Sequence, residues 1–153
     1  MPKTLLAKNI MTKPVISFTE KETIENVIKI LSKTHITGAP VVNKKNHVIG
    51  MVTEKDIALT ALSPHIPKTV SILGGIIMLE NPGHFNSELK KICASKVKDI
   101  MRTPCESIED DTTLQNIILL MSEKNLNRLP VTKKKKLVGI ITRTNILQAL
   151  KTW

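Results

Sequence analysis

Apolar and polar positions follow one another along this chain in short blocks that predict small strands and helices. Apolar residues surround one glycine in Val48–Val52, a pattern typical of a short buried strand. Thr53 follows, and Asp56 stands three residues later. This is the spacing of an N-cap residue and an acid that faces the free N–H groups of a helix start. A helix is therefore predicted from Thr53 to Leu62, and a helix cap is the simplest interpretation of Thr53 and Asp56.

The same strand, cap and helix pattern occurs a second time. Leu137–Ile141 repeats the strand, Thr142 repeats the cap, and Asn145 stands where the first copy has Asp56. The two copies keep a constant spacing, which shortens by one residue in a hairpin turn, so the chain contains an internal duplication. It pairs Ile10 with Ile100, Pro14 with Pro104, Ser17 with Ser107, Thr23 with Thr113, Asn26 with Asn116, Ser32 with Ser122, Pro40 with Pro130 and Gly50 with Gly139.

Each repeat is predicted to run strand, helix, strand, strand, helix, which places the chain in the α+β class. In the first repeat, a capping box at Thr19 and Glu22 is predicted to begin the first helix, which ends near His35. The last helix of each repeat begins at Thr53 or Thr142. The predicted strands are Val15–Phe18, Ala39–Val42, Val48–Val52, Cys105–Ile108, Leu129–Thr132 and Leu137–Ile141.

Residues 63–96 have no counterpart in the other repeat. Val70–Leu79 is an apolar run, and Ser87–Ala94 is predicted to be an amphipathic helix with Leu89 and Ile92 facing inward. So long an insertion needs a role, and packing against its own domain or a partner subunit is favoured over a small-molecule pocket. The predicted organisation is one module over residues 1–153, with repeats at 8–62 and 97–150 and an inserted linker at 63–96.

Composition narrows the class of partner. The 153 residues are 41% hydrophobic but only 2% aromatic, so the core is expected to consist of aliphatic side chains. The formal net charge of +10 favours an anionic partner, which is a nucleotide, a nucleic acid or a membrane surface. Lys133–Lys136 is interpreted as a solvated hairpin turn, with contact to an anion as the alternative.

Catalytic and metal-binding classes find no support in the residue pattern. Cys93, Cys105 and the scattered histidines do not stand at the spacing of a metal site or a nucleophile, so no enzyme activity, metal or required cofactor is expected. The chain lacks an apolar run of the ~18 residues that a membrane span needs, and it lacks a secretory signal. We therefore expect a protein of the reducing cytoplasm with no membrane partner.

With both repeats laid out, the chain resembles a tandem pair of cystathionine-β-synthase (CBS) domains, also called a Bateman module. The resemblance rests on Ile-Met-x-x-Pro at Ile10–Pro14 and Ile100–Pro104, on the two Pro-Val strands, and on the Gly-x-x-Thr-x-x-Asp/Asn pattern. It implies two units packed through their sheets about a pseudo-twofold axis, with clefts that bind adenosyl ligands. It also implies a homodimer that responds to AMP, ADP, ATP or S-adenosylmethionine and regulates a protein partner.

The resemblance also implies a set of ligand-binding residues. It assigns the ribose to Asp56, whose carboxylate offers acceptors for two hydroxyls. Thr53 and the N–H groups of its helix suit a phosphate, and Arg128 is either a phosphate contact or an exposed side chain. Asn145 offers one acceptor oxygen and Glu106 would repel a phosphate, so the second site is weaker, selective for another ligand, or empty. The implied residues are Val15, Ile16, Gly38, Ala39, Pro40, Thr53 and Asp56 in the first repeat, and Cys105, Glu106, Arg128, Leu129, Pro130, Thr142 and Asn145 in the second.

A basic nucleic-acid-binding accessory protein is the alternative function, because of the net charge. Base-stacking aromatic residues are nearly absent, however, and the lysines are spread along the chain. The regulatory, ligand-binding function is therefore favoured over the nucleic-acid-binding one.

Overall fold

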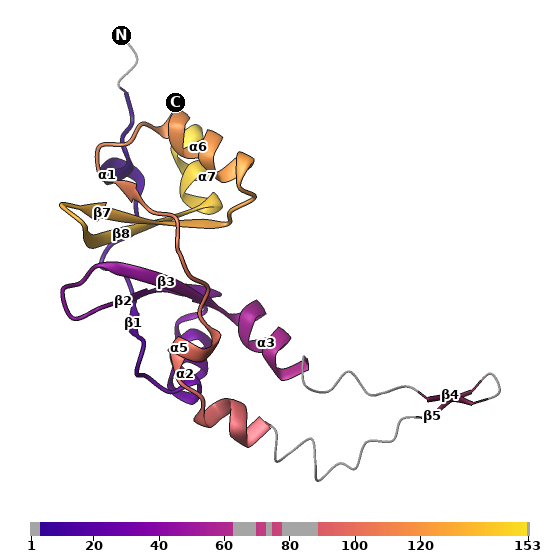
Figure 1. Cartoon of the computed structure of the whole chain (residues 1–153). Helices are drawn as coiled ribbons and strands as arrows, with labels where there is room; N and C mark the ends of the chain where they lie inside the picture. The colour runs from indigo at the N-terminus through magenta and orange to yellow at the C-terminus, as the bar shows by residue number, and fades with distance from the viewer. Residues whose placement is uncertain (1–3, 63–69, 73–74, 78–88, 153) are drawn as a thin grey trace. The chain divides into compact units, whose positions relative to one another are not determined.

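The computed structural model describes residues 4–62, 70–72, 75–77 and 89–152 (Figure 1). These residues form an α+β fold with two three-stranded sheets, of strand order β1-β2-β3 and β6-β7-β8. Each sheet is built from one repeat, which confirms the predicted fold class. The first repeat contains α1 (Ala7–Ile10), β1 (Phe18–Thr19), α2 (Ile24–Thr34), β2 (Gly38–Val42), β3 (Val48–Thr53) and α3 (Glu54–Leu62). The second contains α5 (Val97–Ile100), β6 (Ile108–Glu109), α6 (Leu114–Glu123), β7 (Arg128–Lys133), β8 (Lys136–Thr142) and α7 (Arg143–Lys151).

The first strand of each repeat is shorter and begins later than predicted. β1 and β6 have two residues each, so the predicted strands over 15–18 and 105–108 are right only at their last residue. β6 runs parallel to β7 and pairs only through Ile108 with Val131 and Glu109 with Thr132. β6 begins where its pairing with β7 begins, because the residues before it are not paired with a strand.

The helix that follows the first strand, α2, also begins later than predicted. α2 begins at Ile24, and its N-cap is Thr23, whose Oγ1 accepts the N–H of Asn26 at 3.3 Å. The predicted cap at Thr19 instead closes a separate turn, in which its N–H donates to Glu22 Oε1 at 2.8 Å. Both threonines have an acceptor side chain three residues later. The sequence pattern therefore fits either position, and the prediction selected the wrong one.

The chain folds into two compact units that differ from the two sequence repeats. The first compact unit consists of Met1–Ser17, Pro40–Gly50 and Thr103–Trp153. The second consists of Phe18–Ala39 and Met51–Arg102. The first unit therefore combines α1 and residues 40–50 of the first repeat with the strands and last two helices of the second repeat. The second unit combines α5 with α2 and α3 of the first repeat.

In the first compact unit, the segment around α1 is bonded to the second repeat. Ala7 N donates to Thr112 O at 2.8 Å, and Thr12 and Ile140 exchange backbone hydrogen bonds of 2.8 and 3.1 Å. The Met11 side chain fills the space that a Cβ at Gly139 would occupy. This contact gives the methionine of the Ile-Met pattern a packing role and explains why a glycine stands in the middle of β8.

The second compact unit repeats these bonds with the roles of the two repeats exchanged. Val97 N donates to Glu22 O at 2.9 Å. Arg102 N donates to Met51 O at 2.8 Å, and Met51 N donates to Arg102 O at 3.1 Å. Because Met51 lies in β3 just before Thr53, these two bonds place the Arg102 backbone beside the start of α3.

Each unit has its own apolar core, made almost entirely of aliphatic side chains as the composition predicts. In the first unit, α6 and α7 lie on one side of β7 and β8 (Figure 1), and the core contains Ala7, Ile108, Ile117, Met121, Leu129, Val131 and Ile141. In the second unit, the buried residues include Phe18, Ile24, Val27, Leu31, Val52, Ile57, Ile92 and Val97.

The inserted linker is described only in part. β4 (Val70–Ile72) and β5 (Gly75–Ile77) pair antiparallel, with Val70 opposite Ile77. The predicted amphipathic helix is present over residues 89–94. Its Ile92 is buried as predicted, and Leu89, although 37% exposed, lines the pocket between this helix, α2 and α3, so it faces inward as predicted. Of the apolar run Val70–Leu79, residues 73–74 and 78–79 lie outside the described residues.

The hairpin between β7 and β8 offers a test of backbone strain. Lys134 and Lys135 form the two-residue turn and have φ values of 49° and 69°. Positive φ at both turn positions favours Asn-Gly over two lysines, because glycine has no Cβ and asparagine tolerates the left-handed conformation. We expect the double substitution Lys134→Asn/Lys135→Gly to stabilise the protein by about 1 kcal/mol, which raises the melting temperature by about 2–4 °C. Thermal unfolding measures this shift, and an unchanged or lower melting temperature would show that the lysines cause no strain.

Candidate functional site

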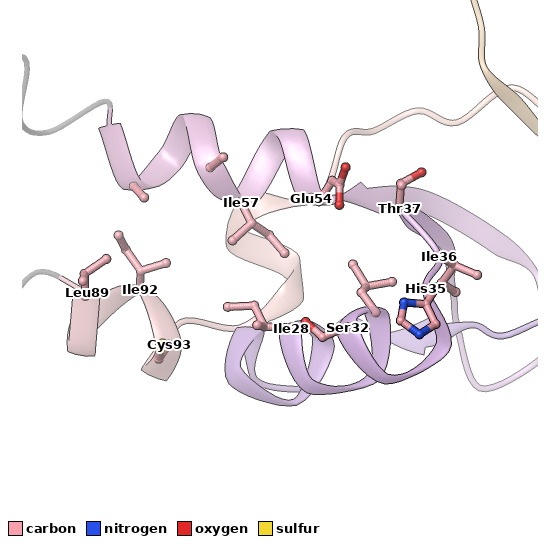
Figure 2. Close-up of a pocket in the computed structure, with 13 residues that line it drawn as sticks. Ile28, Ser32, His35, Ile36, Thr37, Glu54, Ile57, Leu89, Ile92 and Cys93 are labelled. Carbon is pink, nitrogen blue, oxygen red and sulfur yellow. The ribbon is translucent and has the colours of Figure 1, made fainter.

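The second compact unit contains an apolar pocket between α2, α3 and the helical residues 89–94. Its volume is about 500 Å³, within the range of small-molecule sites. Ile28 and Ile57 point into it from opposite walls, and Leu89, Ile92 and Cys93 close one end (Figure 2). None of the site residues implied by the sequence lines this pocket. The pocket therefore lies on the helical side of the unit, and the candidate ribose site has to be built from other residues.

Asp56 lies in the first turn of α3, and its side chain is only 7% exposed. The hydroxyl of Thr53 donates to Asp56 Oδ2 at 2.7 Å. The same hydroxyl oxygen accepts the N–H of Asp56 at 3.1 Å. The helix-cap interpretation of this motif is therefore correct, and the cap also fixes the orientation of the carboxylate.

The second carboxylate oxygen of Asp56 has a partner that the sequence did not predict. Arg102 Nε donates to Asp56 Oδ1 at 2.5 Å, which forms an ion pair. The arginine side chain is 62% exposed, so the pair joins a buried acid to a solvent-facing cation. The two backbone bonds between Arg102 and Met51 hold the arginine there. The sequence signal that could have found Arg102 is its position two residues after Ile100, in the Ile-Met-x-x-Pro pattern.

The first compact unit builds the equivalent arrangement from neutral residues. Asn145 Oδ1 accepts the N–H of Thr142 at 2.8 Å and its hydroxyl at 2.9 Å. Asn145 Nδ2 donates to Thr12 Oγ1 at 3.0 Å. Thr12 stands in the first repeat where Arg102 stands in the second. The two helix starts therefore share one geometry, but one carries an ion pair and the other carries an amide and a hydroxyl.

The remaining implied residues of the first repeat divide between the two compact units. Gly38 and Ala39 are buried at the start of β2 in the second unit, close in sequence to Thr37, whose carbonyl oxygen accepts the N–H of Glu54 at 2.9 Å. This bond brings the start of β2 next to the start of α3, where Asp56 lies. Val15 and Ile16, which are half-buried, and Pro40, which is buried, belong to the first unit.

The implied residues of the second repeat all belong to the first compact unit. Arg128 is half-buried at the start of β7 and stands opposite Thr142 in the strand register. Leu129 and Pro130 follow it and are buried. The Glu106 carboxylate forms an ion pair with Lys124, which offsets the repulsion that Glu106 alone would exert on a phosphate. The structure thus brings Arg128 close to the cap of α7.

Cys105 has a protonated thiol at neutral pH. Burial, and to a smaller extent the charge of Glu106, raise the pKa of this thiol to about 11. Because a thiolate is the nucleophilic form of cysteine, a raised pKa makes the group unreactive. Cys105 therefore acts as a small, half-buried side chain at this position.

We expect alkylation of Cys105 by iodoacetamide to be slow at neutral pH and to accelerate by about tenfold per pH unit up to about pH 11. The rise follows from the sign of the shift, since a raised pKa postpones thiolate formation to higher pH. Peptide mass spectrometry measures the rate, and the urea-unfolded chain serves as the control. Equal rates for the folded and unfolded chain at pH 8 would contradict the raised pKa.

Other kinds of site find no support in the part of the chain that the structure describes. Among those residues, no group of three or more histidine, cysteine, aspartate or glutamate side chains could hold a metal ion. The described helices also include none that is long and apolar enough to cross a membrane.

Comparisons with known proteins agree with the duplication. The CBS domain family matches residues 7–62 and 97–152. An uncharacterized protein of Methanocaldococcus jannaschii, MJ1426, is 30% identical over 154 residues, which covers 95% of this chain and 91% of that protein. The structure of the CBS-pair protein CBSX2 from Arabidopsis thaliana has a TM-score of 0.75 at 22% identity, covering 98% of this chain and 96% of that one.

Two related structures contain adenosyl ligands. A structure of CBSX2 in complex with AMP has a TM-score of 0.71 at 23% identity and covers 96% of both chains. The CBS domain pair of protein MJ0100, in complex with 5′-methylthioadenosine and S-adenosylmethionine, has a TM-score of 0.71 at 21% identity and covers 98% of both chains. At these identities the likeness establishes the fold of the present chain.

Proposed function

The chain belongs to the CBS domain family as a tandem pair, and we propose that it is a regulatory module that binds an adenine nucleotide or a related adenosyl ligand. The observation that carries this proposal is the buried carboxylate of Asp56, oriented by Thr53 at the start of α3. In this proposal the carboxylate accepts hydrogen bonds from the ribose hydroxyls. The ligand changes the activity of a protein partner, and the module itself catalyses no reaction.

The chemistry of the helix start supports this assignment. An ionised carboxylate has about four lone-pair sites, and Thr53 and Arg102 use one each. Two sites therefore remain for the two hydroxyls of a ribose. Thr37 is bonded to Glu54 of α3, and the buried residues Gly38 and Ala39 follow it directly in the chain. In this proposal their backbone groups contact the adenine. The relatives bound to AMP and S-adenosylmethionine make this ligand class the one to test first.

A second, weaker adenosyl site at Asn145 is part of the same proposal. Arg128, Leu129 and Thr142 surround the start of α7, as their counterparts surround the start of α3. The Asn145 amide already directs its oxygen to Thr142 and its nitrogen to Thr12. Fewer acceptor sites are left for a ribose than at Asp56. We therefore assign this site a lower affinity.

The net charge of +10 supports a nucleic-acid-binding accessory protein as the second candidate. Such binding would be electrostatic and would fall steeply as salt concentration rises. The scarcity of aromatic residues ranks this candidate below the adenosyl-binding module.

Asp56→Ala tests the site directly. A thermal-shift panel of AMP, ADP, ATP and S-adenosylmethionine first identifies the ligand, since a ligand at 100 times its dissociation constant stabilises a protein by about 2.7 kcal/mol. We expect Asp56→Ala to weaken binding of that ligand by at least about tenfold, which is 1.4 kcal/mol. Alanine keeps the backbone N–H that Thr53 caps and loses one hydrogen bond from Thr53 and the ion pair with the exposed Arg102, so stability should fall by about 1–3 kcal/mol and the variant should remain folded. Calorimetric titration measures the affinity.

The matched control for this variant is Asp99→Ala. Asp99 is an exposed carboxylate in the first turn of α5 and accepts the N–H of Lys96 at 3.1 Å, so its removal also takes one charge and one cap from the second compact unit. Asp99→Ala should bind as the parent does. Asn145→Ala should cost less affinity than Asp56→Ala, and Asn145→Asp should strengthen the second site. Equal affinity of Asp56→Ala and the parent would reduce the motif to a helix cap.

We also propose a homodimer that pairs through helices. The large apolar side chains that are exposed in the described residues all lie on helices, at Ile28, Leu59, Leu89, Ile118, Leu119, Leu147 and Leu150. Leu119 on α6 is 51% exposed and Leu147 on α7 is 65% exposed. Exposed apolar surface of this kind is typical of protein interfaces.

We expect light scattering to show a dimer at micromolar concentration and a monomer for the double variant Leu119→Gln/Leu147→Gln. Polar side chains remove the gain from burying apolar surface at the interface. The turn variant Lys134→Gln/Lys135→Gln, which changes two exposed residues away from any helix, should leave the dimer intact. A monomeric parent, with or without AMP, would disprove the dimer.

A further inference from the structure

The two helix starts differ at two positions that are in contact with each other. The start of α3 carries Asp56 bonded to Arg102, and the start of α7 carries Asn145 bonded to Thr12. The backbones of Arg102 and Thr12 are held identically, each by two hydrogen bonds to a strand residue. The duplicated framework has therefore kept its geometry, while an ionic pair stands in one copy and a neutral pair in the other.

Arg102 keeps most of its binding capacity for a partner other than Asp56. Its guanidinium carries five N–H donors, and the contact with Asp56 uses the one on Nε. The side chain is 62% exposed, so the rest of the guanidinium faces solvent beside the buried acid. An arginine that only closes a surface ion pair contributes little to stability. Its planar set of donors is, by contrast, well suited to a phosphate.

The position of Arg102 relative to the acid decides which part of a ligand it meets. In the proposed function, Asp56 accepts from the hydroxyls of the ribose. The 5′ substituent is attached to the same small ring, so it lies within the reach of one long side chain from Asp56. Arg102 is that side chain in the second compact unit, and it is positively charged. A phosphate at the 5′ position gains from this charge, an uncharged group does not, and a sulfonium cation is repelled.

We propose that Arg102 makes the Asp56 site selective for adenosyl ligands that carry a phosphate, that is, for adenine nucleotides. This inference rests on the proposed function and adds the charge class of the ligand. Adenosine and 5′-methylthioadenosine, which lack the phosphate, bind more weakly, and S-adenosylmethionine is disfavoured by its sulfonium. The site at Asn145, with Thr12 in place of the arginine, gains no such preference from this position.

The test compares AMP with adenosine, which differ only in the phosphate. Calorimetric titration of the parent, Arg102→Thr and Arg102→Gln with each ligand gives the ratio of the two affinities. Arg102→Thr installs the residue found at the equivalent position of the other repeat, and Arg102→Gln keeps a long side chain without the charge. Because Arg102 also holds Asp56, its loss can change the binding of both ligands, and the ratio of the two affinities isolates the phosphate contact. We expect the ratio of AMP affinity to adenosine affinity to fall by at least about tenfold in both variants.

Lys98→Thr is the matched control. It removes one positive charge from α5, in the same segment as Arg102, at an exposed residue that has no place in the candidate site. Its ratio of AMP to adenosine affinity should equal that of the parent. Raising the salt concentration from 50 to 500 mM should weaken AMP binding to the parent more than adenosine binding, because ions screen the phosphate contact.

The outcomes separate this inference from the proposed function. If the parent binds AMP and adenosine but both Arg102 variants keep the parent's ratio, the arginine only closes an ion pair and the inference is wrong, while the adenosyl site stands. If the parent binds none of AMP, ADP, ATP, adenosine and S-adenosylmethionine, the proposed function itself is wrong and the inference falls with it. If the parent binds S-adenosylmethionine but neither AMP nor adenosine, the inference is wrong while the adenosyl site stands. Circular dichroism melting of each variant shows whether a lost affinity reflects a lost fold.

Discussion

The exchange of backbone hydrogen bonds between Arg102 and Met51, and between Thr12 and Ile140, is the constraint on which the structure depends. Each pair of bonds attaches the segment that begins one repeat to a strand of the other repeat. Met51 is buried, and a buried backbone group without a partner costs ~1–3 kcal/mol, so β3 needs this segment. The same bonds bring residues 102 and 12 to the helix starts, where the candidate sites lie.

Features set by neighbouring residues could be predicted from the sequence. The order of elements and the cap formed by Thr53 and Asp56 depend on residues a few positions apart, and the duplication is visible when the two halves of the sequence are compared. Two features could not be found in this way. The start of α2 was misplaced because two similar caps compete over a few residues, and the segment exchange was missed because it joins residues far apart in the chain. Arg102 was missed for the second reason, since only the fold brings it to Asp56.

The candidate site also shows why a motif alone gives an incomplete picture. The sequence identifies Asp56 as an acid with two oxygens, but the structure shows that each oxygen already accepts one hydrogen bond. A ligand at this position therefore meets a carboxylate that is fixed in place by protein groups. A fixed acceptor binds with a smaller entropy cost than a mobile one, and it holds its ligand in a defined orientation. Geometry of this kind favours discrimination between related ligands.

The segment exchange also bears on how such a chain could have arisen. An ancestral protein with a single repeat would have carried a short helix and an Ile-Met segment whose backbone groups bond only to a strand of a second copy. Two copies of that protein could satisfy each other by trading these segments, in the manner of a domain-swapped pair. Fusion of the two genes would then free the copies to diverge. The acidic and amide helix starts of the present chain are the kind of difference that only a fused, no longer symmetric pair can maintain.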